Sequence, residues 1–152
     1  MSHYLATVRW QRNDGDFRAR TYSREHLWEF DGGSVVPASA SPQIVPLPMS
    51  NAVNVDPEEA FVASLSSCHM LFFLDLAARA GYQIDSYVDA AEGRMGKNAQ
   101  GKTAMTEVTL HPVALFSGPE QPDSATIASL HHKAHELCFI ANSVTTAVAI
   151  AL

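Results

Sequence analysis

The chain has 152 residues, of which 47% are hydrophobic and 9% aromatic, a composition that suits one globular domain with a hydrophobic core. Ten lysines and arginines stand against sixteen aspartates and glutamates, so no basic surface predicts binding to nucleic acid. No secretory leader is recognisable, and the longest charge-free apolar stretch, Ala60–Leu74, is shorter than a bilayer-spanning helix. We therefore expect a single cytoplasmic domain over residues 1–152 with no membrane span.

The first thirty residues carry three short β-like runs. Turn signals with glycine occur at Asn13-Asp14-Gly15, after the first run, and at Asp31-Gly32-Gly33, after the third. These runs predict an N-terminal antiparallel meander, with strands over Tyr4–Trp10, Phe17–Tyr22 and His26–Phe30. From Ser34 to Val55 the chain carries four prolines among small residues, which excludes a helix and predicts a long ordered loop.

A long helix is predicted next. Asp56 is a typical N-cap, Pro57 suits the first helical position, and Glu59 completes a capping box. The helix is expected to run to about Ala80, with Gly81 after its end. Its middle is apolar on nearly every face, so it is predicted to be buried on all sides.

The second half of the chain predicts a hairpin, a second helix and a closing strand, which together give an α+β fold. The hairpin comprises Tyr82–Arg94 and Thr103–Phe116 around a turn near Asn98–Gly101, the helix begins at Asp123 or Ser124 and ends at Leu137, and the strand covers Val144–Leu152.

Two cysteines, Cys68 and Cys138, are too few for the disulfide framework of a secreted domain. Cys68 falls in the middle of the predicted long helix, where burial raises a thiol pKa and no helix terminus lowers it, so a reactive Cys68 needs a nearby cation. Cys138 follows the second helix, where the helix dipole disfavours a thiolate, and this suits a resolving thiol better than an attacking one. Alternatively, both are small buried hydrophobic residues.

The segment Asp56-Pro57-Glu58-Glu59-Ala60-Phe61-Val62-Ala63-Ser64-Leu65-Ser66-Ser67-Cys68-His69 resembles the pattern of the OsmC/Ohr family, in which Asn/Asp-Pro-Glu precedes by ten residues a cysteine on a long central helix. The segment His135-Glu136-Leu137-Cys138-Phe139-Ile140-Ala141-Asn142-Ser143 is similar to the family's second signature. The two motifs and the order of the elements cover nearly the whole chain.

This resemblance implies an OsmC-like fold, with antiparallel sheets packed around a long buried central helix in an intertwined homodimer. It also implies a cofactor-free peroxidase, in which Cys68 attacks an organic hydroperoxide and Cys138 resolves the product as a disulfide. Small dithiols are the implied reductants.

The sequence departs from the family pattern at two places. Phe139 stands where the family usually has proline, and no arginine occurs between Arg24 and Arg79. Arg24 is the closest fit to the family's catalytic arginine, with Arg18 and Arg20 as alternatives, and Glu58 matches the acidic residue that would hold it. Ten residues separate Glu58 from Cys68, about 15 Å of helical rise, so a bridging arginine or a second chain must connect them. We therefore expect Arg24, Glu58 and Cys68 to meet at a homodimer interface.

Two other functions are compatible with the residues. His131, His135 and Cys138 share one helix face and would offer three metal ligands, with His69 as a possible fourth, although histidine near a helix C-terminus is favoured without any metal. A non-catalytic protein of the same fold would hold a small hydrophobic ligand beside the central helix. The residues expected to line that pocket are Met70, Leu71, Phe72 and Phe73. The peroxidase, without cofactor or metal, is the preferred hypothesis.

Overall fold

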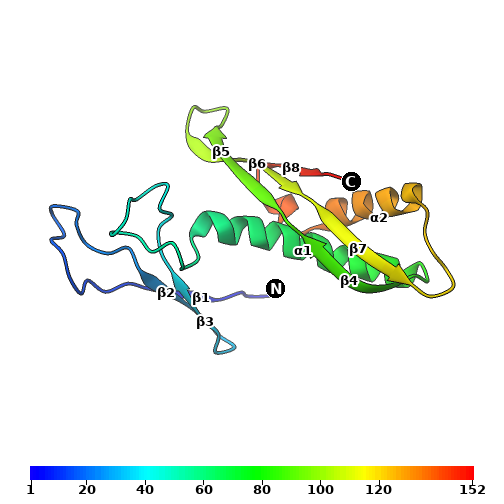
Figure 1. The fold of residues 1–152 in the computed structure, drawn as a ribbon, viewed down its shortest axis with the longest axis horizontal. Helices are drawn as coiled ribbons and strands as arrows, with labels where there is room; N and C mark the ends of the chain where they lie inside the picture. The colour runs from blue at the N-terminus through cyan, green and yellow to red at the C-terminus, as the bar shows by residue number, and fades with distance from the viewer. The chain divides into compact units, whose positions relative to one another are not determined.

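A computed structural model describes residues 1–152 and contains two α-helices, eight strands and one short 3-10 helix (Figure 1). The elements in chain order are β1 (Ala6–Arg9), β2 (His26–Phe30), β3 (Val35–Ala38), α1 (Pro57–Arg79), β4 (Gln83–Asp89), β5 (Glu92–Lys97), β6 (Thr103–Leu110), β7 (Pro112–Ser117), α2 (Ser124–Leu137), η1 (Ala141–Ser143) and β8 (Ala147–Ile150). The α+β class expected from the sequence is confirmed.

The chain divides into two compact units, Met1–Ala60 and Phe61–Leu152, with the boundary inside the first turn of α1. The expectation of one domain over the whole chain stays a prediction.

The first unit contains the predicted antiparallel meander, but with one strand in a different place. Strands β1, β2 and β3 pair in that order, so the third strand is Val35–Ala38. The prediction of a strand over Phe17–Tyr22 is wrong, because this segment turns back on itself. The Asp16 carboxylate accepts the Ala19 N–H at 3.1 Å, and Arg20 adopts a left-handed φ of 64°. Local hydrogen bonds from an aspartate side chain thus outweigh the β propensity of the aromatic residues.

Strand β3 lies within the segment predicted as a loop. Its Pro37 has no N–H to donate, and it is tolerated because β3 is at the edge of the sheet. The rest of the segment is the expected ordered loop, held by two buried serines. Ser39 Oγ accepts the Asn51 N–H at 2.9 Å, and Ser50 Oγ donates to the Val45 carbonyl at 2.6 Å.

Helix α1 begins and ends where the sequence predicts. The Asp56 carboxylate accepts the Glu59 N–H at 2.8 Å, and Glu59 accepts the Asp56 N–H at 3.1 Å, which completes the capping box. Gly81 has a φ of +88°, and the Tyr82 N–H bonds the Ala77 carbonyl at 3.0 Å. This is the glycine C-terminus expected for the helix.

One chain by itself buries only one face of α1, so the expectation that the helix is buried on all sides stays a prediction. Its buried residues recur every four positions and form one face, made of Leu65, His69, Phe73 and Ala77. Leu71, on another face, keeps 60% of its surface exposed. Within the second unit, the strands and α2 therefore cover only one side of α1.

Helix α1, with 23 residues, is long and apolar enough to cross a membrane by length and composition alone. The sequence argument that the apolar stretch is too short therefore does not hold for the helix as formed. Length and composition are weak evidence, however, because the core helix of a globular protein meets the same criteria. The absence of a membrane partner stays a prediction.

In the second unit the predicted hairpin forms but breaks into two strand pairs. Strand β4 pairs with β7, while β5 pairs with β6, and β8 joins β6 in parallel (Figure 1). Asp89 lies at the break, where its Oδ1 atom accepts the His111 N–H at 2.6 Å. The carboxylate thus satisfies a backbone donor at the point where the pairing changes.

Helix α2 begins at the predicted N-cap, since Asp123 accepts the Thr126 N–H at 2.8 Å, and Cys138 is its C-cap residue. Its Leu130 and Ala134 pack with Phe73 and Ala77 of α1 in one buried cluster. A second buried cluster joins α1 to the β5–β6–β8 sheet through Leu65, Val108 and Leu110. These two clusters set the positions of α1 and α2, and with them the positions of the two cysteines.

Candidate functional site

The structure brings the two cysteines together within the second unit. Cys68 lies in α1 and is partly exposed, whereas Cys138 keeps only 1% of its surface exposed, and both are free thiols. Burial raises the pKa of the Cys138 thiol, and interaction with the Cys68 side chain raises it further. At neutral pH Cys138 is therefore a protonated thiol beside the more accessible Cys68.

Backbone hydrogen bonds fix the turn that carries Cys138. The Ala141 N–H donates to Cys138 Sγ at 3.4 Å and partly offsets the rise in its pKa. The Asn142 N–H donates to the Cys138 carbonyl at 3.0 Å, which leads the chain into η1. Phe139, in the place of the usual proline, packs edge-on against Phe72 of α1 with ring centroids 4.9 Å apart. An aromatic contact therefore holds this turn against α1.

A pair of buried histidines lies between the same two helices. His69 Nε2 and His131 Nδ1 are 2.9 Å apart, and the His131 ring stacks on Phe73 with centroids 3.9 Å apart. The pKa of each histidine is lowered to about 4, mainly by burial; His135 also lowers that of His69, His69 lowers that of His131, and Asp89 opposes both shifts. Both rings are therefore neutral at pH 7. The sequence pointed to these histidines only as metal ligands.

The metal site suggested by His131, His135 and Cys138 does not form. No group of three or more histidine, cysteine, aspartate or glutamate side chains is arranged to hold a metal ion. His131 Nδ1 is engaged with His69, and Cys138 Sγ accepts the Ala141 N–H. His131 and Cys138 therefore have hydrogen-bond partners within the protein and are not arranged as metal ligands.

Arg24 belongs to the first unit, where its guanidinium is held by main-chain carbonyls. Its Nη1 donates to the carbonyl of Arg20 at 2.9 Å and to that of Tyr22, and the guanidinium carbon lies 3.7 Å from the centroid of the Tyr22 ring. Within the first unit, Nε and Nη2 donate to no group. Arg18 and Arg20 are exposed, and their side chains make no hydrogen bond. Arg24 is thus the one of the three candidates with an ordered cation and free donors.

Glu58 also belongs to the first unit and forms no ion pair with Arg24. Its Oε2 atom is buried and has no hydrogen-bond partner. A buried carboxylate oxygen without a partner is costly, so this position favours a cation that the first unit does not supply. Arg24 and Glu58 lie in one unit and the two thiols in the other, so no contact between these sets is described.

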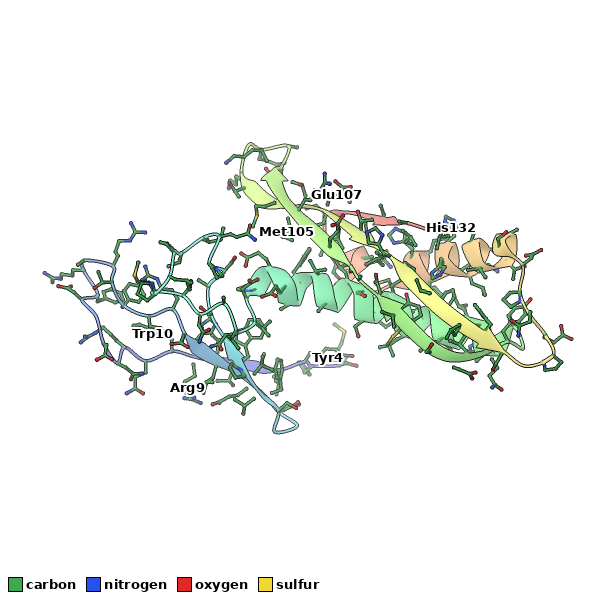
Figure 2. All side chains as sticks on the ribbon, in the orientation of Figure 1. Tyr4, Arg9, Trp10, Met105, Glu107 and His132 are labelled. Carbon is green, nitrogen blue, oxygen red and sulfur yellow. The ribbon has the colours of Figure 1, made fainter.

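An apolar hollow of about 550 Å³ occurs in the first unit. Its aromatic lining consists of Trp10, Phe17 and Tyr22, with the Phe17 and Tyr22 rings stacked 4.8 Å apart (Trp10 is labelled in Figure 2). Arg24 lies on its wall. Sequence reasoning missed this hollow because Phe17–Tyr22 was interpreted as a strand.

Two of the residues predicted to line a hydrophobic pocket beside the central helix have different surroundings in the structure. Phe73 is fully buried in the core cluster with Ala77, Leu130 and Ala134, and Leu71 faces solvent. Phe73 is therefore used for core packing, whereas Leu71 lies at the surface of the chain.

The fold defines the class: the α+β arrangement of two helices and several sheets matches the structures of OsmC/Ohr proteins. The family model for OsmC-like protein matches residues 50–152. Because this match covers more than half of the chain, the protein belongs to the OsmC-like family. No curated protein matched the sequence.

Solved structures extend the match to the whole chain. An OsmC-like protein of unknown function from Vibrio cholerae is 55% identical, with a TM-score of 0.97 and 99% of each chain covered. An organic hydroperoxide resistance protein from Elizabethkingia anophelis is 17% identical, with a TM-score of 0.71 over 99% of this chain and 93% of that one. OhrB of Bacillus subtilis is 18% identical, with a TM-score of 0.63 over 98% of each chain. The last two show a shared fold.

Proposed function

We propose that this protein is a thiol-dependent reductase of organic hydroperoxides. The observation that carries the proposal is the pairing of a partly exposed Cys68 with a buried, protonated Cys138 in the second unit. An accessible thiol beside a second, protected thiol is what a two-cysteine peroxidase needs. Some proteins that share this fold are named for organic hydroperoxide resistance, which agrees with this assignment.

The cycle has three balanced steps. The Cys68 thiolate attacks the terminal oxygen of the hydroperoxide, the O–O bond breaks, and the alkoxide takes a proton to leave as an alcohol while Cys68 becomes a sulfenic acid. Cys138 then attacks the Cys68 sulfur, its proton leaves with the hydroxyl group as water, and a Cys68–Cys138 disulfide forms. A small dithiol reduces this disulfide and is itself oxidised to a disulfide, which regenerates both thiols.

Arg24 is the proposed activator of Cys68. It remains charged when buried, and its Nε and Nη2 donors are free to bind a thiolate on one side and a carboxylate on the other. Glu58, whose buried Oε2 has no partner, is the proposed carboxylate. Because Arg24 and Glu58 form no ion pair within one chain, we assign one of them to a partner chain in a homodimer.

The exposed apolar surface of the first unit supports this dimer. Its sheet leaves Val8 66% exposed and Val35 53% exposed, and Phe17 beside it is 55% exposed. A sheet with apolar residues exposed in this way favours a partner surface. In the second unit Leu71 of α1 is exposed as well, so the helix that carries Cys68 also has apolar surface to cover.

The assay that tests the proposal is consumption of cumene hydroperoxide or tert-butyl hydroperoxide, with dihydrolipoamide or thioredoxin as the reductant. We expect turnover with the small dithiol dihydrolipoamide and none in the Cys68→Ser variant. Absence of turnover with both reductants would contradict the proposal.

The cytoplasm is the proposed compartment, because the cycle needs a reducing environment to regenerate its thiols.

The hollow in the first unit favours one alternative, the binding of a small hydrophobic ligand without its conversion. A volume of about 550 Å³ lined by Trp10, Phe17 and Tyr22 suits such a ligand. In a Trp28→Phe variant, Trp10 is the only tryptophan, so quenching of its fluorescence by cumyl alcohol would report binding. Quenching without any peroxidase activity would favour the binding function.

A further inference from the structure

The side chains of His69 and His131 are polar groups in an apolar core. They keep 1% and 2% of their surface exposed, and the buried residues next to them along α1 and α2 are Leu65, Phe73 and Ala134. An imidazole in such a place is costly unless it is hydrogen-bonded. The Nε2–Nδ1 contact of 2.9 Å supplies one bond to each ring.

The pair lies close in sequence to both thiols. His69 directly follows Cys68 in α1, and His131 precedes Cys138 by seven residues, about two turns, on the same face of α2. The histidine contact therefore ties the helix that carries the first thiol to the helix that ends at the second.

We propose that His69 and His131 are positioning residues, which fix α1 against α2 so that Cys68 and Cys138 lie within range of disulfide formation. This inference rests on the proposed two-cysteine cycle. Apolar packing of Phe73 and Ala77 on Ala134 tolerates small sliding movements, whereas a hydrogen bond tolerates only a few tenths of an ångström. A shift of one residue along α1, about 1.5 Å, would break the bond. A disulfide needs Cα atoms roughly 4.4–6.8 Å apart, so the same shift disfavours it.

The bond is formed by two neutral rings, so one nitrogen donates and the other accepts. His69 Nδ1 is buried without a partner, and an unpaired lone pair is less costly there than an unpaired N–H. We therefore assign the proton to His69 Nε2, which donates to His131 Nδ1. The charged groups that act on the pair are Asp89 from β4 and His135 from α2. This assignment predicts which amides can replace each ring.

The test measures the effective concentration of the two thiols from the Cys68–Cys138 disulfide equilibrium in glutathione buffers. In this reaction two protein thiols and glutathione disulfide give the protein disulfide and two glutathione molecules, so no hydroperoxide is needed. His69→Leu and His131→Leu remove the bond but keep the positions apolar. We expect each to lower the effective concentration about fivefold to tenfold, the ratio that matches one lost hydrogen bond.

His69→Gln places an amide donor near the position of Nε2, and His131→Asn places an acceptor near that of Nδ1, so both are expected to recover most of the parental value. His132→Leu is the matched control, because His132 is exposed on the same helix and pairs with Glu136 at 3.3 Å (Figure 2). Leu65→Ala controls for a general loss of stability. It removes a buried contact of α1 but keeps both histidines, so the effective concentration of its two thiols is expected to fall less than that of the leucine variants.

Parental effective concentrations in both leucine variants would overturn the inference. So would equal losses in the Gln or Asn variants and the leucine variants, or an equal loss in Leu65→Ala. If the leucine variants do not fold, the contrast between the amide variants and Leu65→Ala decides the question. A parental protein that forms the disulfide in glutathione but consumes no hydroperoxide would refute the proposed function and leave this inference standing.

Discussion

At the scale of single residues, the two thiols differ in burial, and this difference sets their expected roles. Cys138 is buried and its pKa is raised, so it is protonated at neutral pH, whereas Cys68 is partly exposed. The sequence predicted the same order from the helix dipole at Cys138. In the structure burial is the largest cause of the raised Cys138 pKa, and the hydrogen bond from the Ala141 N–H partly offsets this increase.

Cysteine replacements test the order of attack. Cys68→Ser is expected to abolish hydroperoxide turnover, because no other thiol is accessible. Cys138→Ser is expected to allow one attack and leave a sulfenic acid at Cys68, which dimedone would trap and mass spectrometry would locate. Retention of parental turnover by Cys68→Ser, or a dimedone adduct at Cys138 in that variant, would show that the order is wrong.

The buried histidines predict a stability that depends on pH. Their pKa values of about 4 in the folded chain lie below the unfolded value of 6.5, so the unfolded chain binds more protons between these values. The free energy of unfolding should therefore fall as the pH falls from about 6.5 towards 4. The loss at pH about 5.5 is on the order of 1 kcal/mol for each histidine.

Urea unfolding at pH about 7.5 and about 5.5 measures this loss. The double variant His69→Leu/His131→Leu should lose much less stability between the two pH values than the parental chain, and His132→Gln should behave like the parental chain. An equal loss in the double variant would assign the pH dependence to other groups.

At the scale of elements, the close approach of β5 to α1 depends on a residue without a side chain. A Cβ atom at Gly93 would lie 2.6 Å from Val62 Cγ2 and 2.5 Å from Met105 Cε. Gly93→Ala is expected to lower the free energy of unfolding by about 1–3 kcal/mol, because α1 or β5 must move to make room. Gly32→Ala is the control, since a Cβ there meets nothing within 4 Å. Urea midpoints compare the two, and equal stabilities would show that the contact relaxes freely.

At the scale of the whole molecule, the proposed homodimer connects the two groups of site residues. Sedimentation of the parental protein should show a dimer.

Arg24→Ala is expected to slow the reaction of Cys68 with hydroperoxide by about tenfold or more, since an opposite charge shifts a thiol pKa by roughly 1–3 units. Arg18→Ala, an exposed arginine without side-chain hydrogen bonds, is the control. A fully active monomer would rule out the shared site, and a parental Cys68 reaction rate in Arg24→Ala would rule out Arg24 as the activator.

Much of the fold follows from local sequence signals. The capping box of Asp56 and Glu59, the C-terminal Gly81 and the N-cap Asp123 placed both helices within a residue or two, because hydrogen bonds between near neighbours define helix ends. The spacing of Asp-Pro-Glu to Cys68 and the position of Cys138 placed the chain in its family. These features need only contacts between residues that are close in sequence.

Other features depended on tertiary contacts. The segment Phe17–Tyr22 forms turns and not the predicted strand, because the Asp16 side chain accepts a hydrogen bond from the Ala19 N–H. The third strand is Val35–Ala38, which pairs with β2. Helix α1 is apolar on several faces, and the sequence does not show which of them is buried within one chain. The reason is that the hydrophobic effect favours burial of any apolar face equally. The contact between His69 and His131, 62 positions apart, is equally invisible in the sequence, because a hydrogen bond between distant residues exists only after packing has brought two helices together.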